Sequence, residues 1–214
     1  ASHRLDFGSS EAKRGTRRAV AMGTVHNADE VAARAGLAQV PASPAELAIA
    51  LSEVGRQDAL AVANGLFCAA VYDEGGHRLE LITDRLASWP IHLWSENGEI
   101  VFAGAIRVLL ADGRPRRLAD PFGIAQLFTM QRTIGDSTSI AGVRALPAAT
   151  ILTIDRDGEH LSRYWNLTWR KPDFDEREGG RRLADALRNA TARDTGPGRA
   201  GLLLSGGFDS RMVL

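Results

Sequence analysis

The chain has 214 residues, of which 44% are hydrophobic and 24% charged, a composition typical of a globular protein of one or two domains. Its 26 Lys and Arg are balanced by 26 Asp and Glu, which argues against a nucleic-acid-binding face or a polybasic membrane patch. No apolar run reaches the roughly 20 residues that a membrane helix needs. The single cysteine, Cys68, excludes an intrachain disulfide, and with no signal-peptide core segment at the start we expect a cytoplasmic protein that binds neither nucleic acid nor membrane.

The first 50 residues predict one strand followed by two helices. Residues 18–25 contain a short apolar run that favours a strand. Asn27 and Glu30 then have the spacing of a capping box, in which a cap residue and an acidic residue three positions later satisfy free N–H groups. The segment 43–46 is a stronger helix start, because Ser43 is a good cap, Pro44 suits the first helical position and Glu46 can reach back.

From residue 65 to 165 the pattern changes to pairs of apolar segments separated by turn residues. Such pairs predict hairpins of antiparallel strands. The three predicted hairpins pair residues 66–72 with 79–83, residues 91–94 with 100–102, and residues 150–154 with 160–164. Between the second and third hairpins, Asp120-Pro121 opens a predicted helix that runs to Met130.

The chain after residue 165 predicts the start of a different domain. Residues 166–178 are polar and form a predicted linker, and an amphipathic helix is predicted from Glu176 to Arg193. A break at residues 195–198 precedes a predicted apolar strand from Ala200 to Leu204 and a glycine-rich loop. We therefore assign residues 1–165 to one domain and residues 179–214 to the beginning of an α/β nucleotide-binding domain.

The glycine-rich loop reads Ser205-Gly206-Gly207-Phe208-Asp209-Ser210. Glycines without a Cβ let the backbone approach phosphate oxygens, and the two serine hydroxyls can donate hydrogen bonds to them. Asp209 would repel a phosphate by itself, but it fits a site where the carboxylate binds Mg²⁺. The loop lacks the lysine of a Walker A motif, so the residues predict a phosphate site of another kind.

This loop, with Leu203 and Leu204 before it, resembles the pyrophosphate-binding loop of the asparagine synthetase superfamily, whose members cleave ATP between its α and β phosphates. GMP synthetase and NAD synthetase share such a loop, and the upstream domain separates them. That domain resembles the class II glutamine amidotransferase domain of asparagine synthetases. The matching segments are residues 64–69, residues 84–91, residues 102–110, residues 144–154 and residues 164–165.

The resemblance implies an N-terminal αββα sandwich of the Ntn-hydrolase kind, followed by an α/β pyrophosphate-loop domain. It implies that ATP and Mg²⁺ are used to adenylate a carboxylate, which ammonia or an amine then attacks to form an amide. The implied ATP-binding residues are Leu203, near the adenosine, and Ser205, Gly206, Gly207, Asp209 and Ser210, with Asp209 also the implied Mg²⁺ ligand.

The glutamine half of the pattern departs from the family in three places. The family hydrolyses glutamine with an N-terminal cysteine, and Ala1 is not that residue, while Cys68 lies inside a predicted strand without a free α-amine. Met22 and Pro44 stand where the family has a glutamine-binding Asn and an Asp that reads the α-amino group. Arg4 matches an arginine that would hold the glutamine carboxylate. We therefore interpret the glutaminase as degenerate.

Three readings of the function follow. The first is an asparagine synthetase-like ligase, glutamine-dependent or not. The second is an enzyme like lasso peptide cyclases and β-lactam synthetases, which use an amine already present in the substrate. The substrate of a lasso peptide cyclase is a precursor peptide. The third is a non-catalytic module that binds a nucleotide or a partner. We expect the chain to be truncated at both ends, with catalytic residues beyond Leu214, and the sequence leaves a homodimer open.

Overall fold

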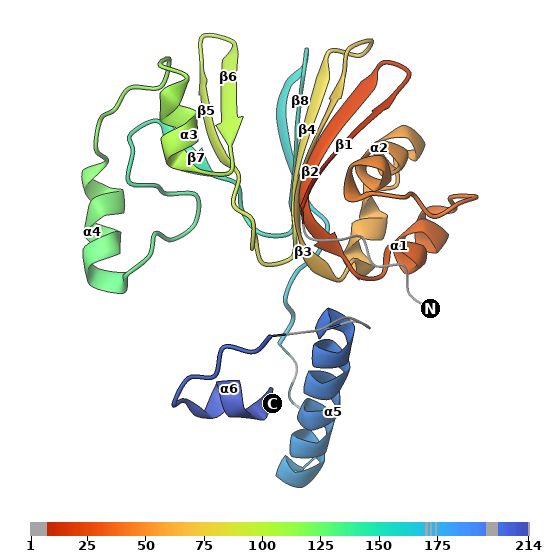
Figure 1. Cartoon of the computed structure of the whole chain (residues 1–214). Helices are drawn as coiled ribbons and strands as arrows, with labels where there is room; N and C mark the ends of the chain where they lie inside the picture. The colour runs from red at the N-terminus through yellow and green to blue at the C-terminus, as the bar shows by residue number, and fades with distance from the viewer. Residues whose placement is uncertain (1–7, 170, 172, 174, 196–200, 214) are drawn as a thin grey trace. The chain divides into compact units, whose positions relative to one another are not determined.

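The computed structural model describes residues 8–169, 171, 173, 175–195 and 201–213. The chain divides between Asn166 and Leu167 into two compact units (Figure 1). Arg4, Pro172 and Ala200 lie outside the described residues, so the predictions made for them have no structural counterpart. Among the described residues, no helix is both long enough and apolar enough to cross a membrane.

The first unit contains a large sheet of six strands in the order β1-β2-β3-β4-β8-β9, and every neighbouring pair is antiparallel. Its strands are β1 (Ser9–Arg14), β2 (Arg17–Val25), β3 (Gly65–Asp73), β4 (Arg78–Thr83), β8 (Thr150–Asp155) and β9 (Gly158–Arg163). The hairpins predicted from residues 66–83 and 150–164 are therefore confirmed.

A smaller sheet of three strands has the order β6-β5-β7 and is also antiparallel. It consists of β5 (His92–Glu96), β6 (Glu99–Ala103) and β7 (Val143–Ala145), and the turn Asn97-Gly98 joins the first two, which confirms the hairpin predicted for residues 91–102. Helix α3 (Ile106–Ala111) contacts β5 and β6, and Leu109 joins Trp94 in a small core. Helix α4 (Pro121–Met130) has the predicted bounds, capped by Asp120.

Helices cover only one face of the large sheet within the part of the chain that the structure describes. Helix α2 (Pro44–Val54) packs against β1, β2 and β3, and helix α1 (Ala28–Ala35) packs against α2 and the 3-10 helix η1 (Gln57–Val62). This packing buries the main core, which includes Val25, Leu47, Leu51, Phe67 and Ile82. The antiparallel α+β fold predicted for this part of the chain is therefore confirmed (Figure 1).

The other face of the large sheet turns toward the small sheet. A second core lies between them and includes Cys68 and Leu81 from the large sheet and Ile91 and Leu93 from the small one. The two sheets thus share an apolar interior, as sheets in a sandwich do.

One of the two predicted helix caps has the expected geometry and the other does not. The Ser43 hydroxyl accepts a hydrogen bond from the Glu46 N–H at 3.2 Å, and the Glu46 carboxylate accepts one from the Ala42 N–H at 3.0 Å. The capping role of Asn27 is wrong, because its side chain makes no cap hydrogen bond. The Asn27 side-chain oxygen instead accepts from the Asn64 N–H at 2.7 Å, and its amide nitrogen donates to the Glu30 carboxylate at 2.6 Å, so the side chain joins Glu30 to a distant segment.

The second unit has helix α5 (Glu176–Thr195) and the short helix α6 (Phe208–Met212). Helix α5 confirms the predicted helix, which ends two residues later than expected. The predicted strand is wrong over its described part, because residues 201–204 form no strand. A strand needs a hydrogen-bonded neighbour, and the described residues of this unit contain no other strand.

Candidate functional site

The predicted phosphate loop folds tightly around its two serines. The Ser205 and Ser210 hydroxyl oxygens lie 2.8 Å apart, and the Ser205 hydroxyl accepts a hydrogen bond from the Gly207 N–H at 3.2 Å. Helix α6 begins immediately afterwards, at Phe208. The structure therefore brings together three of the predicted site residues, Ser205, Gly207 and Ser210.

The remaining predicted residues of the loop are open to solvent. Apart from Gly206 itself and its two chain neighbours, no described residue has an atom within 4 Å of the position that a Cβ on Gly206 would take. Asp209 is exposed, and the Leu203 side chain is 95% exposed. The loop residues expected to contact ATP are thus accessible, but their contact with a nucleotide stays a prediction.

Arg211 belongs to this loop, although the sequence reasoning did not single it out. Its guanidinium donates hydrogen bonds to the carbonyl oxygens of Gly206, at 3.0 Å, and Gly207, at 3.3 Å. It also lies 5.7 Å from the centre of the Phe208 ring. The signal for it is a basic residue directly after the motif, which places a positive charge beside a predicted anion site.

The donor set of the loop fits a polyphosphate better than a metal ion alone. Hydroxyl and backbone N–H donors and one guanidinium lie within seven residues, Ser205 to Arg211. Among the described residues, no group of three or more His, Cys, Asp or Glu is placed to hold a metal ion. Mg²⁺ usually takes one or two carboxylates together with phosphate oxygens and water, so a single carboxylate from Asp209 is compatible with Mg²⁺ bound through a nucleotide.

The two positions where the glutamine pattern departs lie apart in the first unit. Met22 is on β2, 41% exposed, and is paired in register with Cys68 of β3. Pro44 is the first residue of α2 and is buried. Met22 is in register with Cys68, which belongs to the core between the sheets, whereas α2 packs in the main core on the other face of the large sheet. Neither side chain offers a hydrogen-bond donor or a charge.

Cys68 is buried in β3, as the sequence predicted. Burial raises the pKa of its thiol to about 11. The thiolate is the nucleophilic form of cysteine, and this environment disfavours it at neutral pH. Cys68 is therefore a core residue and not a candidate for glutamine hydrolysis.

The matching segment of residues 84–91 begins with Asp84, which is buried. Its carboxylate accepts hydrogen bonds from the N–H groups of Phe67 at 3.0 Å, Leu86 at 2.8 Å and Ser88 at 3.1 Å. The Ser88 hydroxyl adds a further bond at 3.2 Å. Asp84 therefore joins the start of β3 to the loop after β4.

The neighbouring Arg85 ties that loop to the end of the first unit. Its guanidinium donates a hydrogen bond to the Ala61 carbonyl at 2.5 Å and lies 5.4 Å from the centre of the Trp165 ring. The Tyr164 hydroxyl donates to the Thr83 carbonyl at 2.6 Å, and burial raises the pKa of Tyr164 above its usual range. Asp84, Arg85 and Tyr164 thus connect separate segments of the first unit, and their contacts involve no ligand.

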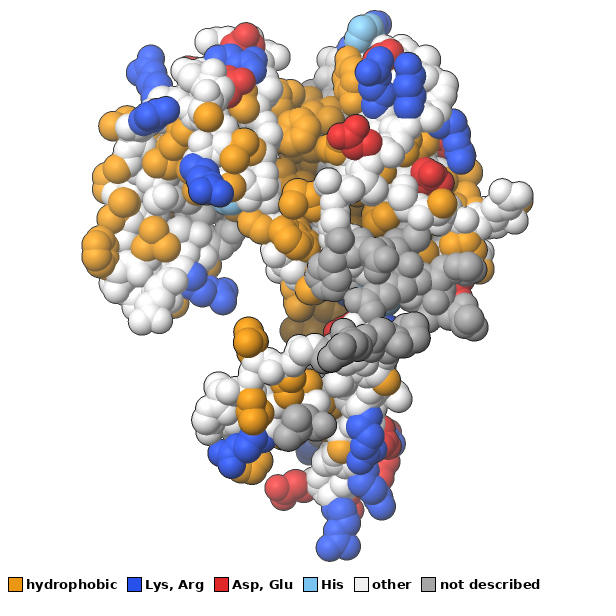
Figure 2. Space-filling model, viewed as in Figure 1, with side chains coloured by type: hydrophobic (Ala, Val, Ile, Leu, Met, Phe, Trp, Pro, Cys, Tyr) orange, Lys and Arg blue, Asp and Glu red, His pale blue; other side chains and the backbone are white. Residues whose placement is uncertain are grey.

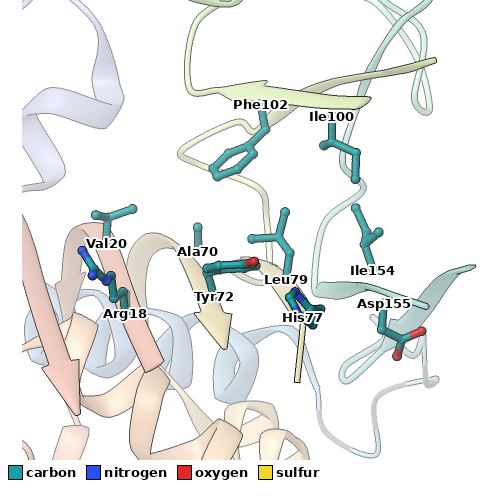
Figure 3. A pocket seen from close by; sticks show the side chains of 11 residues that line it. Arg18, Val20, Ala70, Tyr72, His77, Leu79, Ile100, Phe102, Ile154 and Asp155 are labelled. Atoms are coloured by element: carbon teal, nitrogen blue, oxygen red, sulfur yellow. The ribbon is translucent and has the colours of Figure 1, made fainter. Parts of the chain in front are cut away.

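An apolar cleft lies between the two sheets. One part has a volume of about 480 Å³ and is lined from the large sheet by Val20, Tyr72 and Leu79 and from β6 by Ile100 and Phe102 (Figure 3). A second part of about 240 Å³ is lined by Met22 and Cys68 among others. Figure 2 shows hydrophobic side chains exposed in this hollow.

Comparison with known proteins identifies the family of the first unit. Residues 12–165 match the model of the glutamine amidotransferase domain, and the chain therefore belongs to that family. Among curated proteins it is similar to asparagine synthetase [glutamine-hydrolyzing] 3 of Bacillus subtilis (strain 168), with 28% identity over 163 residues. The chain thus carries an asparagine synthetase-like glutamine amidotransferase domain.

These likenesses cover only part of the proteins concerned. The matched region is 74% of this chain but 26% of the B. subtilis synthetase. Among solved structures, glutamine phosphoribosylpyrophosphate amidotransferase from B. subtilis matches 77% of this chain and 31% of its own, with a TM-score of 0.42 and 11% identity. A regulatory enzyme of purine biosynthesis gives a TM-score of 0.40 over 71% of this chain and 30% of its own, also at 11% identity. Both scores are below 0.5 and add nothing to the family assignment.

Proposed function

We propose that this chain belongs to an ATP-dependent ligase that forms an amide bond. The supporting observation is the order of its parts, an asparagine synthetase-like amidotransferase domain followed by the loop Ser205–Ser210. In such a reaction a carboxylate oxygen attacks the α-phosphorus of ATP and pyrophosphate leaves. The nitrogen of ammonia or an amine then displaces AMP from the acyl-adenylate and loses a proton.

In this proposal the loop residues hold the departing pyrophosphate. The Ser205 and Ser210 hydroxyls and the Gly207 N–H would exchange their present hydrogen bonds for bonds to phosphate oxygens. Asp209 would bind Mg²⁺, whose positive charge offsets the negative charge of the phosphates. Donors fixed at the site of developing charge commonly contribute 10²–10³-fold to a rate.

The test is ATP–pyrophosphate exchange by the whole protein in the presence of candidate carboxylates. We expect Asp209→Ala to lower exchange by about 100-fold. Asp185→Ala is the matched control, because Asp185 is an exposed carboxylate on α5 outside the loop. Exchange that Asp209→Ala leaves unchanged would remove the catalytic role of the loop. Nucleotide binding without any exchange would favour the non-catalytic module.

A second candidate concerns the nitrogen donor, and Met22 and Pro44 favour it. A thioether and a hydrocarbon ring cannot replace the amide and carboxylate that the family uses to recognise glutamine. A lost partner for a charged group costs about 1.5–3 kcal/mol of binding. We propose that the enzyme uses an amine of its substrate or free ammonia, as lasso peptide cyclases and β-lactam synthetases use an internal amine.

This candidate is tested by measuring glutamate formed from glutamine alongside pyrophosphate release. We expect pyrophosphate release to respond to an amine substrate or ammonium, and glutamate to stay at the background level. Glutamate formed in proportion to pyrophosphate would refute the amine-dependent candidate while leaving the ligase intact, so the two proposals fail separately.

A further inference from the structure

Arg211 has no role in the proposed reaction, although it contacts the loop. Its side chain is exposed, yet the guanidinium turns back and donates hydrogen bonds to the carbonyl oxygens of Gly206, at 3.0 Å, and Gly207, at 3.3 Å. The guanidinium also lies 5.7 Å from the centre of the Phe208 ring, a cation–π contact that helps to hold the side chain in place. A cation beside a predicted phosphate site is thus engaged by carbonyl groups of the loop itself.

The two carbonyl groups differ in what else holds them. Gly207 is the N-cap of α6, and the carbonyl of an N-cap residue accepts the first hydrogen bond of its helix. The Gly207 carbonyl also accepts from the Ser210 hydroxyl at 3.2 Å. Gly206 lies before the helix, and glycine can adopt more backbone conformations than any other residue. The Arg211 guanidinium therefore matters most for the direction of the Gly206 carbonyl.

The direction of the Gly206 carbonyl fixes the direction of an N–H group. The same peptide unit carries the Gly207 N–H, and in a trans peptide the C=O and N–H bonds point to opposite sides. No cis peptide bond occurs among the described residues. While Arg211 holds the carbonyl, the Gly207 N–H points to the Ser205 hydroxyl, at 3.2 Å, and this hydroxyl lies 2.8 Å from that of Ser210. Three donors thus converge on the side of the peptide away from Arg211.

We propose that Arg211 is a positioning residue for pyrophosphate, because its guanidinium holds the Gly206 carbonyl away from the site and so directs the Gly207 N–H to a phosphate oxygen. The proposal rests on the proposed function, in which the loop holds the pyrophosphate of ATP, and adds a residue to that site. A carbonyl oxygen turned toward a phosphate would repel it. The guanidinium prevents this orientation of the peptide without binding the anion itself.

The alternative is that Arg211 leaves the two carbonyl groups and binds a phosphate oxygen directly. The site would then gain a charged donor, and the Gly206–Gly207 peptide would be free to turn. The two roles differ in their response to salt. Salt screens the attraction between exposed charges, but it has little effect on the direction in which a backbone N–H points.

The test is isothermal titration of the whole protein with inorganic pyrophosphate and Mg²⁺. We expect Arg211→Met, which keeps an unbranched side chain but removes the donors, to weaken binding about 10-fold, as loss of a hydrogen bond from a charged donor does. Arg211→Lys keeps the charge without the planar fork that spans two carbonyl groups, and should recover only part of the loss. Arg188→Met is the matched control and should leave binding unchanged, because Arg188 is an exposed arginine on α5 outside the loop.

The salt dependence of binding separates positioning from direct contact with the anion. The ratio of the affinities of the unaltered protein and Arg211→Met should stay the same from about 0.05 to 0.5 M salt. A ratio that approaches one at high salt would overturn the proposal, and so would equal effects of Arg211→Met and Arg188→Met. Should Arg211→Met fail to fold, Arg211→Lys decides alone, because positioning predicts weaker binding and a direct charge contact predicts full recovery.

ATP–pyrophosphate exchange by the same variants separates this proposal from the ligase. Pyrophosphate binding that depends on Arg211 in a protein without exchange would refute the ligase and support the positioning role. Exchange that proceeds in Arg211→Met as in the unaltered protein would overturn the positioning role and leave the ligase intact. Failure of the unaltered protein to bind pyrophosphate would overturn the positioning role, whatever the exchange assay shows.

Discussion

Replacing Asp84 by alanine tests the role that the structure gives to this buried carboxylate. The change removes the acceptor for the backbone N–H groups of Phe67, Leu86 and Ser88. The Phe67 bond is buried, so its N–H should incur most of the penalty of about 1–3 kcal/mol for an unsatisfied buried group. The other two bonds are part-buried and water can replace them in part. We expect a total loss of about 3–5 kcal/mol from the free energy of unfolding.

The assay is equilibrium unfolding in urea followed by circular dichroism. Asp120→Ala is the control, because Asp120 also accepts two backbone N–H bonds, from Phe122 and Gly123, but at the start of an exposed helix. Loss of such a cap costs about 1 kcal/mol. Asp84→Asn, which keeps one oxygen acceptor, should fall between the two. If Asp84→Ala cost no more than Asp120→Ala, the carboxylate would not hold β3 and the following loop together.

Three further changes probe the packing and the titrating groups of the first unit. Gly23→Ala should destabilise the fold by more than about 3 kcal/mol in thermal unfolding, since a Cβ would stand 1.9 Å from the Leu66 carbonyl oxygen, whereas Gly98→Ala, with nothing within 4 Å, should cost about 1 kcal/mol. The raised pKa of Cys68, about 11 against 9.0 for a free thiol, means that the unfolded state ionises first. The free energy of unfolding should therefore decrease as the pH rises from 9 to 11. The melting temperature measured over this range should fall less in Cys68→Ala than in the unaltered protein. Burial lowers the pKa of His92 below 6.5, so the unfolded state binds the proton first. Stability should therefore decrease as the pH falls below about 6.5, less steeply in His92→Gln, and an unchanged slope would contradict the assignment.

The hairpins could be predicted because their information is local. Residues 91–94 and 100–102 are short, mainly apolar segments on either side of Asn97-Gly98, and that pair favours the tight turn found there. Strand β1 was missed because Ser9–Arg14 has no apolar alternation, and it is a strand only because it pairs with β2. Helix α3 is six residues long and depends on the contact of Leu109 with the small sheet, which no local pattern reveals.

The loop and the cleft also differ in whether their residues can be recognised in the sequence. The loop Ser205–Ser210 is contiguous, so its residue types and their order could be recognised in the sequence. The cleft joins β2, β3, β4 and β8 to β6, and its residues come from positions more than 130 apart in the chain. No sequence motif marks the cleft, because its lining residues are of types that are common in any strand. The exposure of Val20 appears only once both sheets are placed.

The family assignment and the question of the nitrogen donor rest on different residues. Asp84 and Arg85 match the family pattern, and the structure gives both a structural reason to be there, in hydrogen bonds to β3 and to the Ala61 carbonyl. A domain that no longer hydrolysed glutamine would still need them. Met22 and Pro44 carry no such constraint, since one is half-exposed and the other suits the first turn of a helix for local reasons. Membership of the amidotransferase family is therefore compatible with either nitrogen donor, and the assay of glutamate against pyrophosphate decides between them.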